Sequence, residues 1–184
     1  YQYCSLSMPQ EELYFKTMKS WPNFIDRIKK NKITFRPFKS NFGWNEIKFI
    51  KMNVIKNKNL KISENVNLIC DLQNICLCVI TYNSTTIFQL IYANFPFICF
   101  WNPNHWQIKS SMKKRYQYLK NCGILHDSAE SAADFINNLN NQISEWWNSN
   151  STKSNLRKFC QSFLEIDHQP EKKWGSALQE ILKN

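Results

Sequence analysis

The sequence predicts an α/β fold: a three-layer, Rossmann-like domain with a mostly parallel sheet and helices at its C-terminal end. Two apolar runs of strand length, residues 77–82 and 97–101, enclose a short helical segment at 87–94. This order is the core of a βαβ unit, whose two strands are parallel neighbours. In the rest of the chain, strand-like runs alternate with helical patterns, as they do in α/β domains.

The polar turn inside this unit is the strongest candidate for a binding site. Four small polar residues separate the first strand from the helix: Asn83, Ser84, Thr85 and Thr86. Ligands of open α/β sheets lie beyond the carboxyl ends of the strands, where a helix start offers backbone N–H groups to an anion. We therefore expect these side chains to bind a phosphate or carboxylate. The alternative is that Ser84 or Thr85 only caps the helix.

The patterns before this unit predict short elements. We expect a strand at 1–7, a helix from 9 to about 30 that Pro22 kinks or divides, and a strand at 32–36 ended by Pro37. A loop at 40–44, a short helix at 45–52, a strand at 60–63 and a helix from 63 to about 75 complete this half.

The patterns after this unit are mainly helical. A loop at 102–106 precedes a basic helix at 107–121, which Gly123 stops, and a short strand follows at 124–126. Ser128 begins a long helix whose apolar face extends to Trp147. We expect further helices at 154–166 and from Pro170 onward.

Composition favours one globular domain. The chain has 184 residues, of which 43% are hydrophobic, and no apolar run is long enough to cross a membrane. Its seven cysteines are odd in number and form no C-x-x-C pair, which disfavours a zinc site or a disulfide framework and indicates a reducing cytoplasm. The net charge of +10 fits nucleic acid, an acidic membrane surface or anionic small molecules, but an AT-rich genome would also enrich lysine.

Four residues outside the turn are further candidates. Arg36 ends a predicted strand, where its guanidinium could clamp a phosphate, although a surface ion pair is the alternative. Lys109 could neutralise a leaving phosphate or only face solvent. Trp101 and His105 border the expected cleft, where a base or sugar could stack. For His126 we favour an ordinary hydrogen-bonding role.

Several ordered motifs resemble a known family. Arg36 followed by residues 41–44 resembles its R-x-x-x-x-D/N-[YF]-G-W segment. Residues 81–86, with Pro96 and the Phe-Trp pair at 100–101, resemble its T-Y-x-S-T-T…P…F-W segment. The family comprises transferases of bacterial surface-carbohydrate biosynthesis, which look like GT-B-type glycosyltransferases. They are distantly similar to the Kdo-, sialic-acid- and polyglycerol-phosphate-type transferases.

The resemblance implies a single nucleotide-sugar-binding domain over residues 1–184, the C-terminal half of a two-domain enzyme, without the N-terminal acceptor domain. It would transfer sugar from a nucleotide-sugar donor, CMP-linked donors included, to a glycan or glycolipid acceptor. Catalysis would be electrostatic, through the turn, Arg36 and Lys109, without a cofactor. No D-x-D pair is visible, so we expect no metal. The implied location is the cytoplasm, at the inner membrane surface.

One position departs from the family pattern. Family members carry Glu five residues after the Ser of the turn, where GT-B enzymes often hold a ribose diol, whereas this chain has Gln89. An amide can donate and accept but lacks the charge that strengthens such bonds. This favours an alternative, a non-catalytic remnant or interaction domain of the same fold. A nucleic-acid-binding domain is suggested by charge alone, without a recognisable motif, so we expect no nucleic-acid partner.

Overall fold

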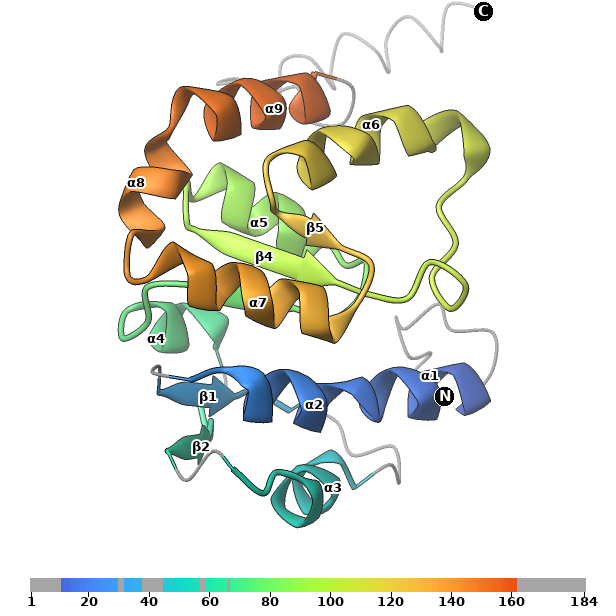
Figure 1. The fold of residues 1–184 in the computed structure, drawn as a ribbon, viewed down its shortest axis with the longest axis vertical. Coiled ribbons are helices and arrows are strands. Elements are labelled where there is room, and N and C mark those ends of the chain that lie inside the picture. The colour runs from blue at the N-terminus through green and yellow to red at the C-terminus, as the bar shows by residue number, and fades with distance from the viewer. Residues whose placement is uncertain (1–10, 30–31, 38–44, 57–58, 66, 162–184) are drawn as a thin grey trace, which may run out of the picture.

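The computed structural model of the chain describes residues 11–29, 32–37, 45–56, 59–65 and 67–161 (Figure 1). Three sequence expectations lie outside these residues: the strand at 1–7, the loop at 40–44 with its Gly-Trp motif, and the helix from Pro170. The strands are β1 (Ile33–Phe35), β2 (Leu60–Ile62), β3 (Cys78–Ile80), β4 (Phe97–Phe100) and β5 (Leu125–His126). The helices are α1 (Glu11–Met18), α2 (Ser20–Arg27), α3 (Glu46–Asn53), α4 (Leu68–Leu72), α5 (Thr86–Tyr92), α6 (Ser110–Asn121), α7 (Ala129–Leu139), α8 (Ile143–Asn148) and α9 (Asn150–Cys160).

The expected βαβ unit is confirmed. Strand β3, helix α5 and strand β4 follow one another, and β3 pairs in parallel with β4, Cys78 opposite Phe97 and Ile80 opposite Cys99. Strand β5 adds to the other edge of β4, also in parallel. All strand pairs in the described ranges are parallel, so the fold is a mixed α/β arrangement of alternating strands and helices.

The strands form two small sheets, which differs from the single sheet that the sequence suggests. Strands β1 and β2 pair only with each other within the described part, and β3, β4 and β5 form the second sheet. Each strand is at most four residues long. The apolar patterns identify the strands, but which strands pair depends on contacts between distant segments.

Helices cover both faces of the three-stranded sheet. All four residues of β4 are buried, as expected for a strand enclosed on two sides. Phe97 packs edge-on against Trp147 of α8, whereas Phe100 stacks on Phe24 of α2, with ring centroids 5.1 Å apart. Figure 1 shows α2 alongside α7 on one side of β4, and α6 with α9 on the other.

Three helix boundaries differ from the expectations. The N-terminal helix divides at Lys19, not at Pro22, which lies in the first turn of α2, where its missing N–H costs no helical hydrogen bond. The long helix from Ser128 ends at Leu139, because Asn140 and Asn141 adopt left-handed backbone angles, φ 43° and 73°. Helix α9 begins at Asn150, four residues early, since Ser149 caps it. Within the described residues, every helix is too short or too polar to cross a bilayer.

Candidate functional site

The carboxyl ends of β3 and β4 bring two polar loops to one edge of the sheet. The turn at 81–85 follows β3 and leads into α5. The loop at 101–109 follows β4 and leads into α6 (Figure 1). Because the two strands are parallel neighbours, both loops leave the sheet on the same side. The sequence-predicted turn and the loop with Trp101, His105 and Lys109 therefore share one edge of the sheet.

The turn does not cap α5 with a side chain. Thr85 has helical backbone angles and makes no side-chain cap bond, although its carbonyl oxygen accepts from Phe88 N–H at 3.0 Å. Thr85 is exposed and Thr86 is half-buried. The simple capping alternative is therefore absent for Thr85, and the threonine hydroxyls remain candidates for a ligand.

Ser84 is the unusual member of the turn. Its hydroxyl oxygen is buried and has no hydrogen-bond partner in the described part of the chain. A buried hydroxyl without a partner costs free energy, and native proteins rarely retain one without a compensating role. In this structure the Ser84 hydroxyl is closed to solvent.

Trp106 is a second such group, in the loop after β4, and the sequence reasoning missed it. Its indole Nε1 is buried without a partner among the described residues, and its ring stacks on Tyr82, with centroids 5.6 Å apart and planes 30° apart. Tyr82 belongs to the turn after β3, so this stack joins the two loops. An aromatic residue in each loop after neighbouring strands is the sequence signal that could have identified the pair.

Asn83 and Trp101 hold the turn to α6. The Tyr116 hydroxyl donates to Asn83 Oδ1 at 3.0 Å, and burial raises the pKa of this tyrosine, so it stays protonated and able to donate. Trp101 packs edge-on against the same Tyr116, and its side chain is only 2% exposed. The expected stacking role of Trp101 is corrected: its ring belongs to the core and offers no face to a ligand.

His105 and Gln89 lie on the borders of the same region. His105 is half-buried, and its Nδ1 lies 3.4 Å from the hydroxyl of the buried Thr17, which ties the loop after β4 to α1. Gln89 is exposed, one turn into α5 from Thr85. Both side chains are therefore accessible, in contrast to Trp101.

Arg36 is engaged elsewhere. Its guanidinium forms an ion pair with the buried Asp71 and donates to Asn65 O at 3.0 Å. Burial alone would raise the pKa of Asp71, but hydrogen bonds from Asn65, Ser63 and Arg36 hold it below its ordinary value. The ion-pair alternative describes Arg36, which lies just beyond β1 of the two-stranded sheet and is held by Asp71.

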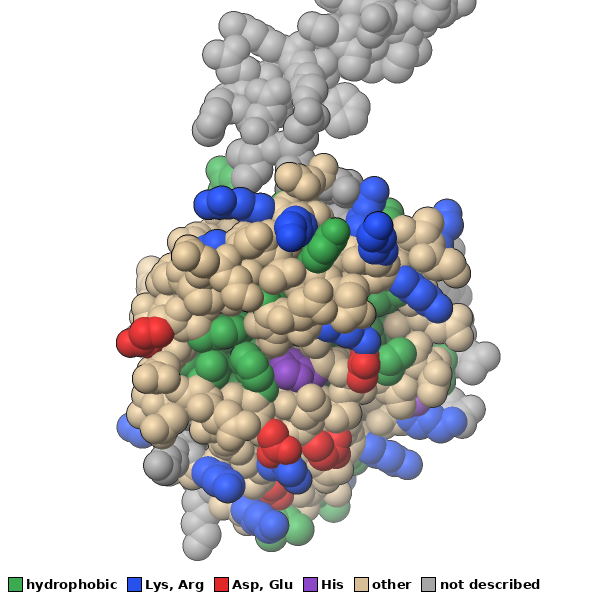
Figure 2. All heavy atoms as spheres, turned by 45° about the horizontal axis from the view of Figure 1, so that its top comes forward, with side chains coloured by type: hydrophobic (Ala, Val, Ile, Leu, Met, Phe, Trp, Pro, Cys, Tyr) green, Lys and Arg blue, Asp and Glu red, His purple; other side chains and the backbone are tan. Residues whose placement is uncertain are grey.

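Lys109 remains at the predicted edge. It immediately precedes α6 and is exposed. Helices α6 and α9, which pack together, carry basic side chains and no acidic ones. Figure 2 shows Lys and Arg side chains over the upper part of this face. The positive potential of such a surface favours an anionic ligand.

Comparison with known proteins identifies the family. The profile of the LIC12162 family transferases matches residues 1–178, nearly the whole chain. Neither the curated proteins nor the solved structures give a match. The transferase part of the sequence resemblance is thereby confirmed, at the level of the family. The chain belongs to the LIC12162 family of transferases.

Proposed function

We propose that this transferase is a glycosyltransferase of surface-carbohydrate biosynthesis, which binds the phosphate of a nucleotide-activated sugar at the turn after β3. Membership of a transferase family supports group transfer in general. The observation that carries the donor site is a pair of buried donors in adjoining loops, Ser84 Oγ and Trp106 Nε1, neither of which has a partner among the described residues.

The chemistry of these two groups suits an anionic oxygen. An indole N–H can only donate, and a serine hydroxyl can donate to a phosphate oxygen. Bonds to a charged acceptor are about twice as strong as neutral ones, so a bound phosphate would compensate the burial of both groups. Both atoms are covered in this structure, so donor binding requires the loop at 101–109 to move away from the turn.

The remaining polar groups at this edge have defined roles in the proposal. Thr85 and Thr86 add hydroxyl donors, and Asn83 keeps its amide nitrogen for the ligand while its oxygen bonds Tyr116. Lys109 supplies the positive charge that stabilises the leaving nucleotide phosphate. We do not assign phosphate binding to Arg36, because its guanidinium is paired with Asp71. Gln89 contacts the ribose hydroxyls as a neutral donor and acceptor.

The architecture belongs to the same proposal. The chain provides the donor-binding, Rossmann-like half of a GT-B enzyme, and the acceptor glycan or glycolipid and the catalytic base belong to another domain. The described cysteines are free thiols, which fits action in the reducing cytoplasm, with the acceptor at the inner membrane surface. The alternative, a non-catalytic domain of the same fold, rests on Gln89 in the place of the family's Glu.

Substitution of Ser84 separates binding from folding. Ser84→Ala removes a hydroxyl that makes no bond in the described structure, so the free energy of unfolding is expected to stay constant or rise. Nucleotide affinity is expected to fall about tenfold, because a charge-assisted bond is lost. Urea unfolding and calorimetric titration with CMP, CDP, UDP and GDP measure the two effects.

Ser128→Ala is the matched control. Ser128 caps α7 by accepting from Ser131 N–H at 3.1 Å, so its loss costs about 1 kcal/mol of stability without touching the turn. Trp106→Phe tests the second donor, since it keeps the ring stack and removes only the N–H. If none of the four nucleotides binds, or if Ser84→Ala binds them as the unaltered chain does, the donor-site proposal is wrong.

A further inference from the structure

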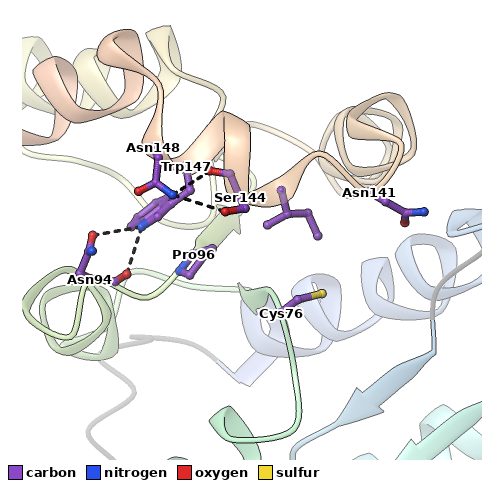
Figure 3. Close-up of a pocket in the computed structure, with 8 residues that line it drawn as sticks. Cys76, Asn94, Pro96, Asn141, Ser144, Trp147 and Asn148 are labelled. Carbon is purple, nitrogen blue, oxygen red and sulfur yellow. Dashed lines mark hydrogen bonds between the residues drawn. The ribbon is translucent and has the colours of Figure 1, made fainter.

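A pocket lies at the opposite end of the sheet from the turn. It has a volume of about 400 Å³ and opens beside the amino end of β4, between the end of α5 and helix α8 (Figure 3). Its polar lining comes from three separate segments: Asn94 after α5, Asn141 between α7 and α8, and Ser144 and Asn148 on α8.

Asn94 presents its amide nitrogen in a fixed orientation. Its oxygen accepts from Trp147 Nε1 at 3.2 Å and from Lys153 Nζ at 2.7 Å, while its backbone, at φ 50°, accepts the same indole N–H at 3.1 Å (Figure 3). Two donors on the oxygen determine which way the amide points. The nitrogen is thus left as a donor for another group.

Asn148 is held in place by Ser144. Its nitrogen donates to the backbone oxygen of Ser144 at 2.9 Å and approaches the Ser144 hydroxyl at 3.4 Å (Figure 3). Figure 3 shows Asn141 and Cys76 on the far side of the pocket. Asparagine side chains, which can both donate and accept, therefore line two sides of the pocket.

The chemistry of the lining selects a neutral ligand. Among the described residues that line the pocket, Cys76 alone has an ionisable side chain, although the chain carries a net charge of +10. The nearby Lys153 ammonium donates to the Asn94 side-chain oxygen and lies 4.8 Å from the centre of the Trp147 ring. Pro96 and Ile143 contribute apolar side chains to the lining of the pocket. Amides beside apolar carbon match the hydroxyls and C–H faces of a sugar ring.

We propose that this pocket binds a neutral sugar unit of a glycan, at a site separate from the donor turn. The proposal does not depend on donor binding, because no phosphate contact is involved and the two sites lie at opposite ends of β3 and β4. In a transferase such a site would hold a sugar unit of the glycan that lies away from the reacting end, in addition to the acceptor site that we place in another domain.

The thiol of Cys76 provides a direct readout. Cys76 lines the pocket and is exposed, whereas Cys70 is exposed and does not line it. We expect glucose, galactose, rhamnose or N-acetylglucosamine, added singly at saturating concentration, to slow alkylation of Cys76 by iodoacetamide and to leave Cys70 unchanged. Peptide mass spectrometry gives both rates from one sample, and glycerol at equal concentration controls for the cosolvent. Equal slowing of both thiols, or no slowing of Cys76 by any of the four sugars, overturns the proposal.

Two neighbouring asparagines give a matched pair of variants. Asn140 and Asn141 both have left-handed backbone angles, which glycine adopts freely, but only Asn141 lines the pocket. Asn141→Gly should weaken sugar protection of Cys76 about fivefold through one lost hydrogen bond, and Asn140→Gly should preserve it. Equal behaviour of the two variants overturns the proposal. Nucleotide affinity should be unchanged in both, so that failure here and failure at the turn are distinguishable.

Discussion

His126 shows how burial sets the behaviour of a single residue. Both ring nitrogens are bonded: Nε2 lies 3.0 Å from Gly123 O and Nδ1 lies 2.9 Å from Ser131 Oγ. A carbonyl oxygen only accepts, so Nε2 carries the proton and Nδ1 accepts from the serine. The ordinary hydrogen-bonding role that the sequence suggests for His126 is confirmed. Gly123, its partner, has φ 74°, and a Cβ there would lie 2.4 Å from the Phe135 ring.

The titration of His126 gives a pH-dependent contribution to stability. Burial lowers its pKa, partly opposed by the bond to Gly123, so the unfolded chain takes up a proton at a higher pH than the folded chain. This contribution is present above the unfolded pKa of about 6.5 and is lost as the pH falls through the lower folded value. Urea unfolding between about pH 7.5 and pH 5.5 should show stability falling with acidity.

His126→Gln removes the titrating group and is the test of this assignment. The variant should be less stable than the unaltered chain at neutral pH, because its hydrogen bonds change, but its stability should depend less on pH over the same range. Asp71 and Asp134, whose pKa values are lowered, contribute only at more acidic pH. If the free energy of unfolding depends on pH equally in the variant and the unaltered chain, His126 is not the source of this pH dependence.

At the scale of elements, one carboxylate joins the two-stranded sheet to α4. Asp71 of α4 accepts from Ser63 Oγ at 2.8 Å and from Asn65 Nδ2 at 2.6 Å, just after β2, and it pairs with Arg36, just after β1. A strand pair of three residues each has little stability of its own. The Asp71 network therefore fixes the ends of both strands.

Loss of this carboxylate should be costly. Asp71→Ala removes several hydrogen bonds to a buried charge and is expected to lower the free energy of unfolding by about 2 kcal/mol. Asp127→Ala is the control, because Asp127 pairs with Lys120 at the surface, where an ion pair contributes less than about 1 kcal/mol. Chemical denaturation of both variants measures the difference. Equal effects would mean that Asp71 is a surface charge in solution.

At the scale of the whole molecule, α2 and α7 join segments far apart in the sequence. Arg27 pairs with Asp134 at 2.6 Å. The Asn137 side chain bonds two backbone groups at the C-terminal end of α2, accepting from Lys29 N–H at 3.1 Å and donating to Arg27 O at 2.9 Å. The side chains of Arg27 and Asp134 are about half exposed, whereas Asn137 bonds backbone groups left open where α2 ends.

Asn137 is therefore expected to matter more than the ion pair. Asn137→Ala removes two side-chain bonds to exposed backbone groups at the end of α2, and it should lower the free energy of unfolding by about 1 kcal/mol, because water replaces part of each bond. Asp134→Ala should change stability little, with an effect that disappears in high salt. Thermal unfolding at low and high salt checks both expectations, and a larger loss for Asp134→Ala would reverse this ranking.

The sequence by itself determined the local features: the strand–helix–strand order of β3, α5 and β4, the cap at Ser128 and the helix stop at Gly123. These depend on apolar periodicity and backbone preference over a few residues. Only the tertiary structure decided that Ser84 and Trp106 bury donors that no described residue bonds, that Trp101 belongs to the core and that Arg36 pairs with Asp71. The pocket amides, too, come from separate segments. The burial and partners of a side chain are set by distant segments that pack around it, and a local pattern holds no information about them.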